Sequence, residues 1–295
     1  MVSALNRKLL RDFWNMRGQA LAIAMVLAGG VATWLISFSA LESLEFTQQR
    51  FYAEYRFADV FARVNRAPER LAERIAEIPG VRRVETRTVG IATLDVPGFD
   101  DPATATTVSI PDRGQPALNR LYLRSGRLPQ GQDEVAISEP FAEAQGLGPG
   151  DTLTAIINGQ RRQLRISAVA LSPEYVYQIS PGSLFPDFER YAIFWMREEP
   201  LSAAWDMESA FNDVALSLER GADEEAVIER LDLLLARYGG TGAYGREDQL
   251  SNQFLSEEIK SLRGSATVVP LIFLGVAAFL LSVVIGRIVD QQRDQ

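Results

Sequence analysis

Residues 126–153 read GRLPQGQDEVAISEPFAEAQGLGPGDTL, a stretch that combines a strand pattern, a short helix pattern and a glycine-rich end. DEVAIS has the apolar content of a strand, and the residues after it have the composition of a short helix. The glycines of GLGPGD favour a helix C-cap followed by a turn into the next strand. The stretch therefore predicts a mixed α and β domain.

GLGPGD does not have the pattern of a phosphate-binding loop. A P-loop requires Lys-Ser or Lys-Thr after its last glycine, and a dinucleotide-binding loop opens a helix after a strand. Here a strand follows the glycines, and Asp151 would repel a phosphate. Gly240 and Gly245 have the spacing of a P-loop, but Arg246 and Glu247 replace the required lysine and hydroxyl. The sequence therefore predicts no ATP site.

The composition excludes several kinds of chemistry. None of the 295 residues is cysteine or histidine, which rules out thiol nucleophiles, imidazole bases, disulfides and Cys/His zinc sites. Acidic residues are numerous, but no pair stands out as catalytic carboxylates. We therefore predict no catalytic, cofactor-binding or metal-binding residue and no enzyme activity. The net charge of −8 argues against nucleic acid as a partner.

Two β-α-β patterns lie on either side of the central segment. The first consists of a strand at 58–64, a helix at 67–78 and one or two strands within 81–96. The second consists of a strand at 211–219, a helix at 223–240 and a short strand within 242–248. Two such patterns separated by an insertion predict a ferredoxin-like split α+β fold.

The insertion, about residues 104–200, is predicted to be mostly β. Asn158-Gly159 lies between two alternating segments, which is the strongest short-range signal for a β-hairpin. Further strands are predicted at 104–110, 133–138, 174–180 and 190–196. Aromatic residues gather between 175 and 195; they predict core and loop packing, with a contact surface for an apolar or lipid-like ligand as the alternative.

Two apolar runs flank this domain. Residues 19–41 carry no charge over 23 residues, which as a helix would measure about 34 Å and exceed a hydrocarbon core of about 30 Å. Residues 266–286 carry no charge over 21 residues. A cleaved signal peptide is the alternative for the first run, with Ser37-Phe38-Ser39 as its cleavage site, but the run is longer than a signal's apolar region. We predict two membrane-spanning helices that extend to about residue 56 and from about residue 247.

Charge predicts the orientation of these helices. The flanking ends carry 6 basic and 3 acidic residues, so residues 42–265 hold 24 basic and 35 acidic residues, a net charge of −11. Basic flanks stay in the cytoplasm, so the long acidic segment is expected outside. The resulting organisation is a basic amphipathic cytoplasmic segment (1–18), a first span (19–41), an extracytoplasmic domain (42–265), a second span (266–288) and a cytoplasmic end (289–295).

The two spans also carry small residues that would allow close helix packing in lipid. They are Gly29, Gly30, Thr33, Gly275, Ala277, Ala278 and Ser282. Two helices alone make a poor translocation path, so further spans are expected from elsewhere. Neither span holds an ionisable residue, so the sequence does not support an ion relay through them.

The chain resembles the FtsX-like/MacB-type ABC transporter permeases. Residues 126–153 are similar to the family's Gly-Arg-x-Pro, Glu-Val-x-Ile-Ser and Ala-x-x-x-Gly-Leu-x-x-Gly-Asp patterns. The matching residues are Gly126, Arg127, Pro129, Glu134, Val135, Ile137, Ser138, Ala142, Gly146, Leu147, Gly150 and Asp151. Residues 272–295 resemble the family's second span and the start of its cytoplasmic turn.

The resemblance implies a fold, a location and partners. It implies an extracytoplasmic domain with a ferredoxin-like "porter" part, about 58–96 and 206–248, and an inserted mostly-β "sabre" part, about 104–200. It implies an inner (plasma) membrane location and a cytoplasmic ABC ATPase partner. Further permease spans or a second permease copy, and membrane lipids, would be the other partners. The family continues beyond a second span, so the chain is expected to be an N-terminal piece or a truncated product.

The expected function is that of a permease subunit that couples ATP hydrolysis by its partner to movement of the outside domain. Export or extraction of a lipid, a lipoprotein or a peptide-like substrate would follow. The alternative is a two-span sensor whose outside domain binds a ligand. A membrane-anchored exported enzyme is a third hypothesis, and the sequence offers no catalytic set for it.

Overall fold

The computed structural model describes Trp14 and residues 17–96, 103–183 and 185–293. It divides into two units, a helical unit (Met1–Gln48 and Ser256–Gln295) and a sheet unit (Gln49–Leu255). Most of the expected amphipathic segment, 1–13 and 15–16, lies outside the described residues.

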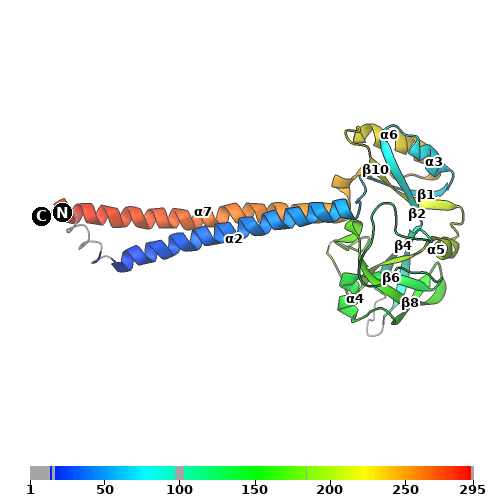
Figure 1. The fold of residues 1–295 in the computed structure, drawn as a ribbon, viewed down its shortest axis with the longest axis horizontal. Helices are drawn as coiled ribbons and strands as arrows, with labels where there is room; N and C mark the ends of the chain where they lie inside the picture. Colours follow the sequence, from blue (N-terminus) through cyan, green and yellow to red (C-terminus); the bar gives the residue numbers. More distant parts are fainter. Residues whose placement is uncertain (1–13, 15–16, 97–102, 184, 294–295) are drawn as a thin grey trace. The chain divides into compact units, whose positions relative to one another are not determined.

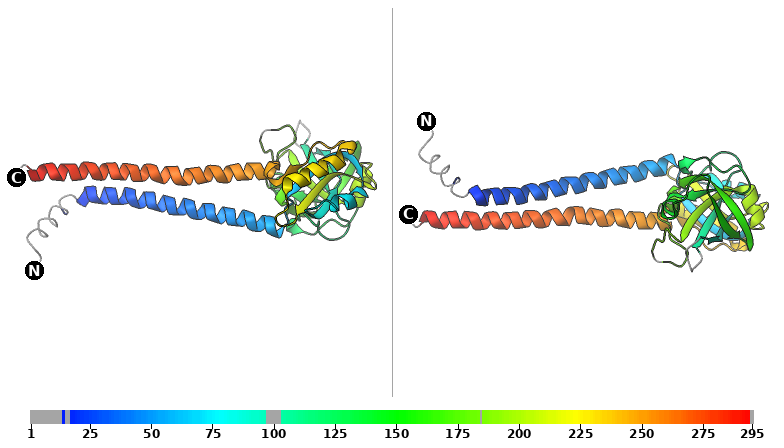
Figure 2. Two further views of the ribbon diagram at one scale, coloured as in Figure 1. Left: turned by 90° about the horizontal axis from the view of Figure 1, so that it is seen from above. Right: turned by 90° about the horizontal axis from the view of Figure 1, so that it is seen from below.

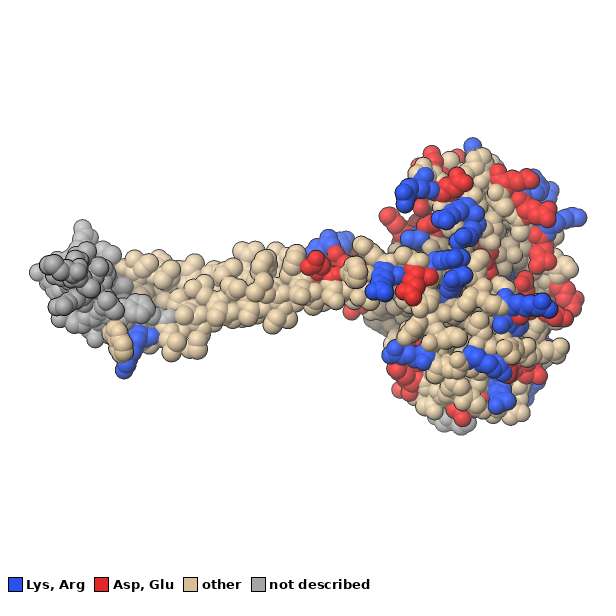
Figure 3. Space-filling model, in the orientation of Figure 1, with Lys and Arg blue, Asp and Glu red and all other residues tan. Residues whose placement is uncertain are grey.

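Two long helices leave and enter the sheet unit. They are α2 (Arg17–Glu54) and α7 (Leu250–Arg293), and α7 continues through Pro270. Both are long and apolar enough to cross a membrane. Within the helical unit the two helices run side by side in both views of Figure 2. On the face drawn in Figure 3, charged side chains are sparse over this unit, whereas the sheet unit displays charges of both signs.

Buried positions within the helical unit follow one another at 4, 7 or 11 residues, spacings that keep them on one face of each helix. These positions are Ile23, Gly30 and Leu41 in α2, and Ile259, Ala266, Pro270 and Ala277 in α7. A Cβ on Gly30 would lie 3.1 Å from the Cβ of Phe273, so glycine permits the close approach. The predicted small-residue faces are therefore only partly used within this helix pair. Gly29, Gly275, Ala278 and Ser282 are exposed.

Four antiparallel strands form the smaller sheet, in the order β11-β1-β10-β2. The strands are β1 (Val60–Pro68), β2 (Val81–Arg87), β10 (Ala210–Leu218) and β11 (Tyr244–Gly245). The helices α3 (Leu71–Ala76) and α6 (Glu224–Leu235) bury Leu71, Ile75, Val227 and Leu231 in its core. Both helices lie over this sheet (Figure 1). This is the predicted ferredoxin-like arrangement, called the porter part below.

Seven strands form the larger sheet, in the order β5-β8-β6-β9-β4-β3-β7. They are β3 (Val89–Asp95), β4 (Ala103–Ile110), β5 (Tyr122–Gly126), β6 (Glu134–Ser138), β7 (Thr152–Ile157), β8 (Gln160–Leu171) and β9 (Tyr191–Arg197). An additional pairing of β7 with β8 closes six of them into a ring, which removes most of the sheet edge. With α4 (Glu139–Gln145) and α5 (Glu198–Ala204), this is the sabre part.

The division between the two parts differs from the prediction in one respect. The sequence pattern placed residues 58–96 together, but β2 and β3 belong to different sheets. β2 pairs with β10, whereas β3 pairs with β4 and β7. Only Thr88 separates the two strands, so the chain passes directly from one sheet to the other.

Most local predictions in the sabre part are confirmed. Asn158 and Gly159 have φ of 48° and 76°, as a type I′ turn requires, and Ile157 pairs with Gln160. The turn after α4 also has the predicted form. Gly146 caps the helix with φ of 65°, and the Gly148 N–H donates to Asp151 Oδ2 at 2.8 Å before β7 begins.

The strand predicted at 174–180 is wrong. Pro173–Tyr175 form a 3-10 turn, η1, and the Ser172 side chain accepts a hydrogen bond from the Glu174 N–H. Pro173 has no N–H for a strand ladder, and the ring of strands is already closed without this segment. Two further 3-10 turns, η2 (Ala236–Tyr238) and η3 (Arg246–Asp248), flank the last strand of the porter part.

Candidate functional site

A buried ion cluster lies where the porter and sabre parts meet. Arg87 at the end of β2 donates from Nε to Asp213 Oδ1 on β10 at 2.8 Å. The same guanidinium makes a two-pronged bond to Glu174 in η1, with Nη1–Oε2 at 2.5 Å and Nη2–Oε1 at 3.0 Å. All three side chains are nearly inaccessible to solvent. One arginine therefore joins a porter strand to the chain that leaves the sabre sheet.

Neutral side chains complete the hydrogen bonding of Glu174. Asn119 Nδ2 donates to Glu174 Oε2 at 2.7 Å, and Gln249 Nε2 donates to the Glu174 carbonyl at 2.8 Å. Asn119 in turn accepts from the Ala58 N–H at 2.9 Å. Every described partner in this cluster is therefore paired, which is the condition under which buried charge is tolerated.

The charges of the cluster stabilise one another. Burial alone would lower the pKa of Arg87, but the Asp213 and Glu174 carboxylates raise that pKa well above its ordinary value. Arg63 lies at the cluster's edge, where its Nε is 3.6 Å from Asp213 Oδ2 and its side chain is 57% exposed. Burial would lower the pKa of Arg63, but the Asp213 carboxylate and neighbouring acidic groups together outweigh this effect, and the pKa of Arg63 is raised. The two guanidinium groups of the cluster therefore stay protonated across the physiological range.

A cavity of about 400 Å³ opens beside this cluster. Both parts and the start of α7 contribute to its wall, including Arg63, Ile91, Tyr175, Tyr191, Tyr244 and Leu250. Burial, then the charges of Glu174 and Asp213, raises the pKa of Tyr244 to about 12. The tyrosines therefore remain neutral and present rings and hydroxyls, a lining typical of sites for partly apolar ligands.

The aromatic group predicted between 175 and 195 is divided by the fold. Tyr191, Phe194 and Trp195 are buried in β9, and Tyr175 packs edge-on against Trp195 with ring centroids 6.2 Å apart. Tyr177 instead stacks on Phe254 of α7 at 5.8 Å. Phe185 is 75% exposed. The packing role applies to most of the group, and Tyr175, Tyr177 and Tyr191 also line the cavity.

The sheet-unit ends of both long helices are bonded into the same region. At the end of α2, the Tyr55 and Arg56 carbonyls accept from the Arg120 and Asn119 N–H groups at 2.8 and 2.9 Å. At the start of α7, Ser251 Oγ accepts from the Tyr177 N–H at 2.8 Å. Tyr52 and Asn252 join the two helices by a hydrogen bond of 3.1 Å. The helix ends, the porter strands and the sabre loop therefore form one connected network.

Sequence reasoning did not identify this cluster. Arg87 and Asp213 are 126 positions apart, and each lies in an ordinary strand pattern. A charged residue at an inward position of a predicted strand was the only available signal. The segment 240–246, which has the glycine spacing of a P-loop without its lysine, has a structural role. Gly245 lies in β11 beside β1, and the Arg246 side chain donates to backbone carbonyls.

The stretch 126–153 is likewise structural. Arg127 and Glu134 form a two-pronged ion pair with distances of 2.8 and 2.7 Å, and the Gln130 N–H donates to the same carboxylate at 2.8 Å. A Cβ on Gly126, whose φ is +79°, would lie 2.1 Å from the Ser167 carbonyl oxygen. These residues hold β5, β6 and β8 together and do not line the cavity.

One family model matches this chain, and several solved structures are similar to it. Residues 16–234 match the family described as MacB-like periplasmic core domain. The periplasmic region of MacB from Actinobacillus actinomycetemcomitans is 12% identical, with 71% of this chain and 95% of that chain covered and a TM-score of 0.40. The extracellular domain of the ABC-type transporter YknZ from Gram-positive bacteria is 13% identical, with 64% and 98% covered and a TM-score of 0.40. A comparison with curated proteins found no match.

The family match covers most of the described sheet unit and the whole of the first apolar run. Two apolar helices flank the mixed domain, as the predicted fold class requires. The chain therefore belongs to the family of the MacB-like periplasmic core domain, the extracytoplasmic domain of ABC-type transporter permeases.

Proposed function

We propose that the chain is a permease subunit that couples ATP hydrolysis by a cytoplasmic partner to movement of its extracytoplasmic domain. Its membrane is the inner, or plasma, membrane, with spans at 19–41 and 266–288 and the domain 42–265 outside. The cargo is a lipid, a lipoprotein or a peptide-like molecule. The net charge of −11 outside and the basic flanks inside support this orientation.

One observation carries this proposal: the network that joins the helix ends to both parts of the domain. Gln249, next to the start of α7, donates to the Glu174 carbonyl, and Glu174 binds Arg87 of the porter part. Asn119 links the end of α2 to the same carboxylate. A displacement of either helix end therefore acts on the porter and sabre parts together. Such a rigid, fully bonded junction suits the transmission of movement.

We expect the cavity beside this network to change its shape when the helix ends move. Ile91 comes from β3 of the sabre part, and Leu250 opens α7; both line the cavity. Their separation would change if the helix end moved relative to the sabre part. The absence of cysteine allows both positions to be labelled without background.

The proposal is tested by purifying the tagged chain from its own membranes in mild detergent. We expect a cytoplasmic ABC ATPase to co-purify and its ATPase rate to rise in the presence of the permease. A cross-linker joining Ile91→Cys and Leu250→Cys should give a yield that changes with ATP. A matched pair within the sabre part, Asp95→Cys and Arg161→Cys, should give an unchanged yield.

Two outcomes would contradict the proposal. Purification without any nucleotide-hydrolysing partner would contradict the proposed coupling to ATP hydrolysis. A cross-linking yield that does not change with ATP at either cysteine pair would contradict the proposed movement. Co-purification with a histidine kinase or a methyl-accepting protein would favour the two-span sensor instead.

A further inference from the structure

A second pocket of the sheet unit is basic. It measures about 360 Å³ and is separate from the tyrosine-lined cavity. Four arginines line it: Arg56, Arg82, Arg83 and Arg246. Asp59 is its one acidic lining residue. This concentration of positive charge occurs in a segment, 42–265, whose net charge is −11, so overall charge does not account for it.

Only one of the four arginines is neutralised. Arg246 Nη2 lies 2.5 Å from Asp59 Oδ1, and its other bonds go to the carbonyls of Phe57 and Ala58 at 2.7 and 2.8 Å. Arg56, Arg82 and Arg83 have no carboxylate partner among the residues that the structure describes. The pocket therefore keeps three uncompensated guanidinium groups around one space.

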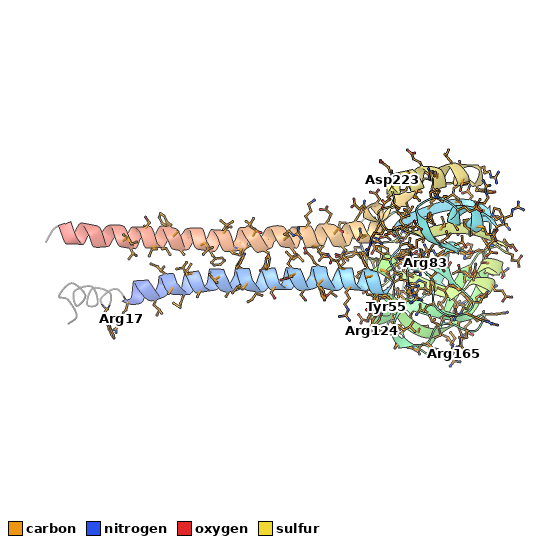
Figure 4. The ribbon with its side chains drawn as sticks, turned by 45° about the horizontal axis from the view of Figure 1, so that its top comes forward. Arg17, Tyr55, Arg83, Arg124, Arg165 and Asp223 are labelled. Carbon is orange, nitrogen blue, oxygen red and sulfur yellow. The ribbon has the colours of Figure 1, made fainter. Side chains whose placement is uncertain are left out.

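An irregularity in β2 brings two of these arginines to the same pocket. Successive side chains of a regular strand point to opposite faces, so Arg82 and Arg83 would normally diverge. The pairing of β2 with β10 shifts here, with Ser217 opposite Arg83 but Leu218 opposite Val81. Bulges of this kind re-aim side chains at sheet edges. β2 is an edge strand, and Arg83 is labelled in Figure 4.

Arg56 is held in a conformation that arginine rarely adopts. Its φ is 51°, in the left-handed region, at the end of α2 where glycine is the usual residue. The Phe57 N–H donates to the Tyr52 carbonyl at 2.9 Å and closes the helix end around it. A non-glycine residue under such strain persists only where the surrounding structure holds it in place. Here the strained residue contributes its charge to the pocket.

A buried hydroxyl in the same pocket lacks a partner. Ser217 Oγ makes no hydrogen bond within the described part of the chain, although the atom is inaccessible to solvent. Ser217 lies on β10 directly across from Arg83 and lines the pocket. Buried polar atoms are usually paired, so the Ser217 hydroxyl is a donor left free for an acceptor that enters the pocket. A rotation of the side chain would turn it toward that acceptor.

We propose that this basic pocket binds a phosphate group. Guanidinium groups bind phosphate oxygens through paired, charge-assisted hydrogen bonds, and a serine hydroxyl adds a further donor. The volume holds a phosphate together with part of the molecule that carries it. The phosphate belongs to a lipid headgroup or to a soluble phosphate compound. Gln49, which lines the pocket, follows the predicted first span by only eight residues.

The binding test uses the full chain in a neutral detergent, with inorganic pyrophosphate as the probe in isothermal titration calorimetry. We expect saturable binding that weakens with added sodium chloride, since exposed charges are screened. Arg82→Gln combined with Arg83→Gln should weaken binding at least tenfold. The control is Arg220→Gln combined with Arg230→Gln, two exposed porter arginines outside the pocket, which should change affinity less than twofold.

Two further variants separate binding from folding. Arg56→Gly relieves the strained backbone, so it should fold at least as stably as the parent chain and yet bind pyrophosphate several-fold more weakly. Ser217→Ala should also weaken binding without loss of stability. Equal affinity in the parent chain, Arg56→Gly and the double arginine variant would overturn the proposal, as would the absence of binding to the parent chain.

The source of the phosphate is distinguished in lipid nanodiscs. Discs of phosphatidylcholine alone are compared with discs that include phosphatidic acid. Competition between phosphatidic acid and pyrophosphate supports a lipid headgroup in the pocket, and unchanged pyrophosphate affinity supports a soluble phosphate compound. Phosphate binding at this pocket requires no ATPase partner. A chain that does not bind phosphate would therefore overturn this inference and leave the proposed permease function unaffected.

Discussion

Arg87 and Glu174, which stand 87 positions apart in the chain, form a two-pronged ion pair buried between the porter and sabre parts. The pair is continued by Asp213 on one side and Asn119 on the other. Because Asn119 also accepts from Ala58, just beyond the end of α2, the ion pair is the central member of the junction.

Removal of Arg87 should destabilise the chain severely. Arg87→Met leaves Glu174 without a cation and Asp213 with only the exposed Arg63 at 3.6 Å, a change that costs about 3 kcal/mol or more. We expect a lower Tm for the full chain in detergent, followed by fluorescence. The exposed Arg161, which pairs with Asp95 at 2.6 Å, provides the control, and Arg161→Met should cost less than about 1 kcal/mol. Equal losses in the two variants would contradict the role of the cluster.

Glu198 should make stability fall as the pH rises. Burial, followed by the charges of Glu69 and Asp112, raises the pKa of Glu198 from 4.5 to about 7. A raised folded pKa gives stability that is complete below pH 4.5 and lost as the pH rises through about 7. Glu198→Gln should therefore be more stable than the parent chain at pH 8, by about 1 kcal/mol after screening. Denaturant titrations at pH 5 and pH 8 measure this, and an equal difference at both would argue against it.

Glu134 should have the opposite dependence. The bond to Arg127 lowers the pKa of Glu134 from 4.5 to about 2. Desolvation opposes this shift, and hydrogen bonds from the Gln130 and Gly131 N–H groups add to it. The stabilisation is present above pH 4.5 and lost as the pH falls through about 2. Glu134→Gln should be less stable than the parent chain at pH 7 and closer to it at pH 3. A gap between their Tm values that does not shrink on acidification would be inconsistent with this assignment.

Two glycines of the stretch 126–153 should respond differently to alanine. Both have positive φ, +79° for Gly126 and +105° for Gly150, but only Gly126 has backbone atoms in the way. Gly150→Ala meets open space and should cost about 1 kcal/mol of strain. Gly126→Ala would place its Cβ 2.1 Å from the Ser167 oxygen, so the β5–β8 pairing must shift and the loss should be several-fold larger. Similar Tm values for the two variants would refute the close approach.

Glu45 and Arg263 should report the pairing of α2 with α7. Their side chains form an ion pair within the helical unit. In this cysteine-free chain, Glu45→Cys with Arg263→Cys should be joined by a short bis-maleimide in isolated membranes. Proteolysis within the sheet unit would then leave one cross-linked product on a gel. Phe46→Cys with Arg263→Cys is the control, because Phe46 is 64% exposed and lies about 100° further round the helix. Equal yields would contradict the observed pairing face.

Features that depend only on neighbouring residues could be predicted from the order of the amino acids. Uncharged runs indicated the two long helices, because each helical residue adds a fixed rise and lipid excludes charge. Asn158-Gly159 specified a hairpin, and GLGPGD specified a capped helix and a turn, because positive φ is local. The alternation of strands with helices also indicated the ferredoxin-like porter part.

The tertiary structure alone decided which distant segments pair. β3 follows β2 after one residue yet joins the other sheet, since its partners β4 and β7 lie there. In the sequence Arg87 resembles any other strand residue, and only the fold brings Asp213 and Glu174 to it. Likewise, Arg82 and Arg83 line one pocket because β2 pairs irregularly with β10. Sheet pairing and buried charge depend on contacts between residues far apart in the chain, 87 positions for Arg87 and Glu174 and 126 for Arg87 and Asp213, and no local pattern of residues encodes which partners meet.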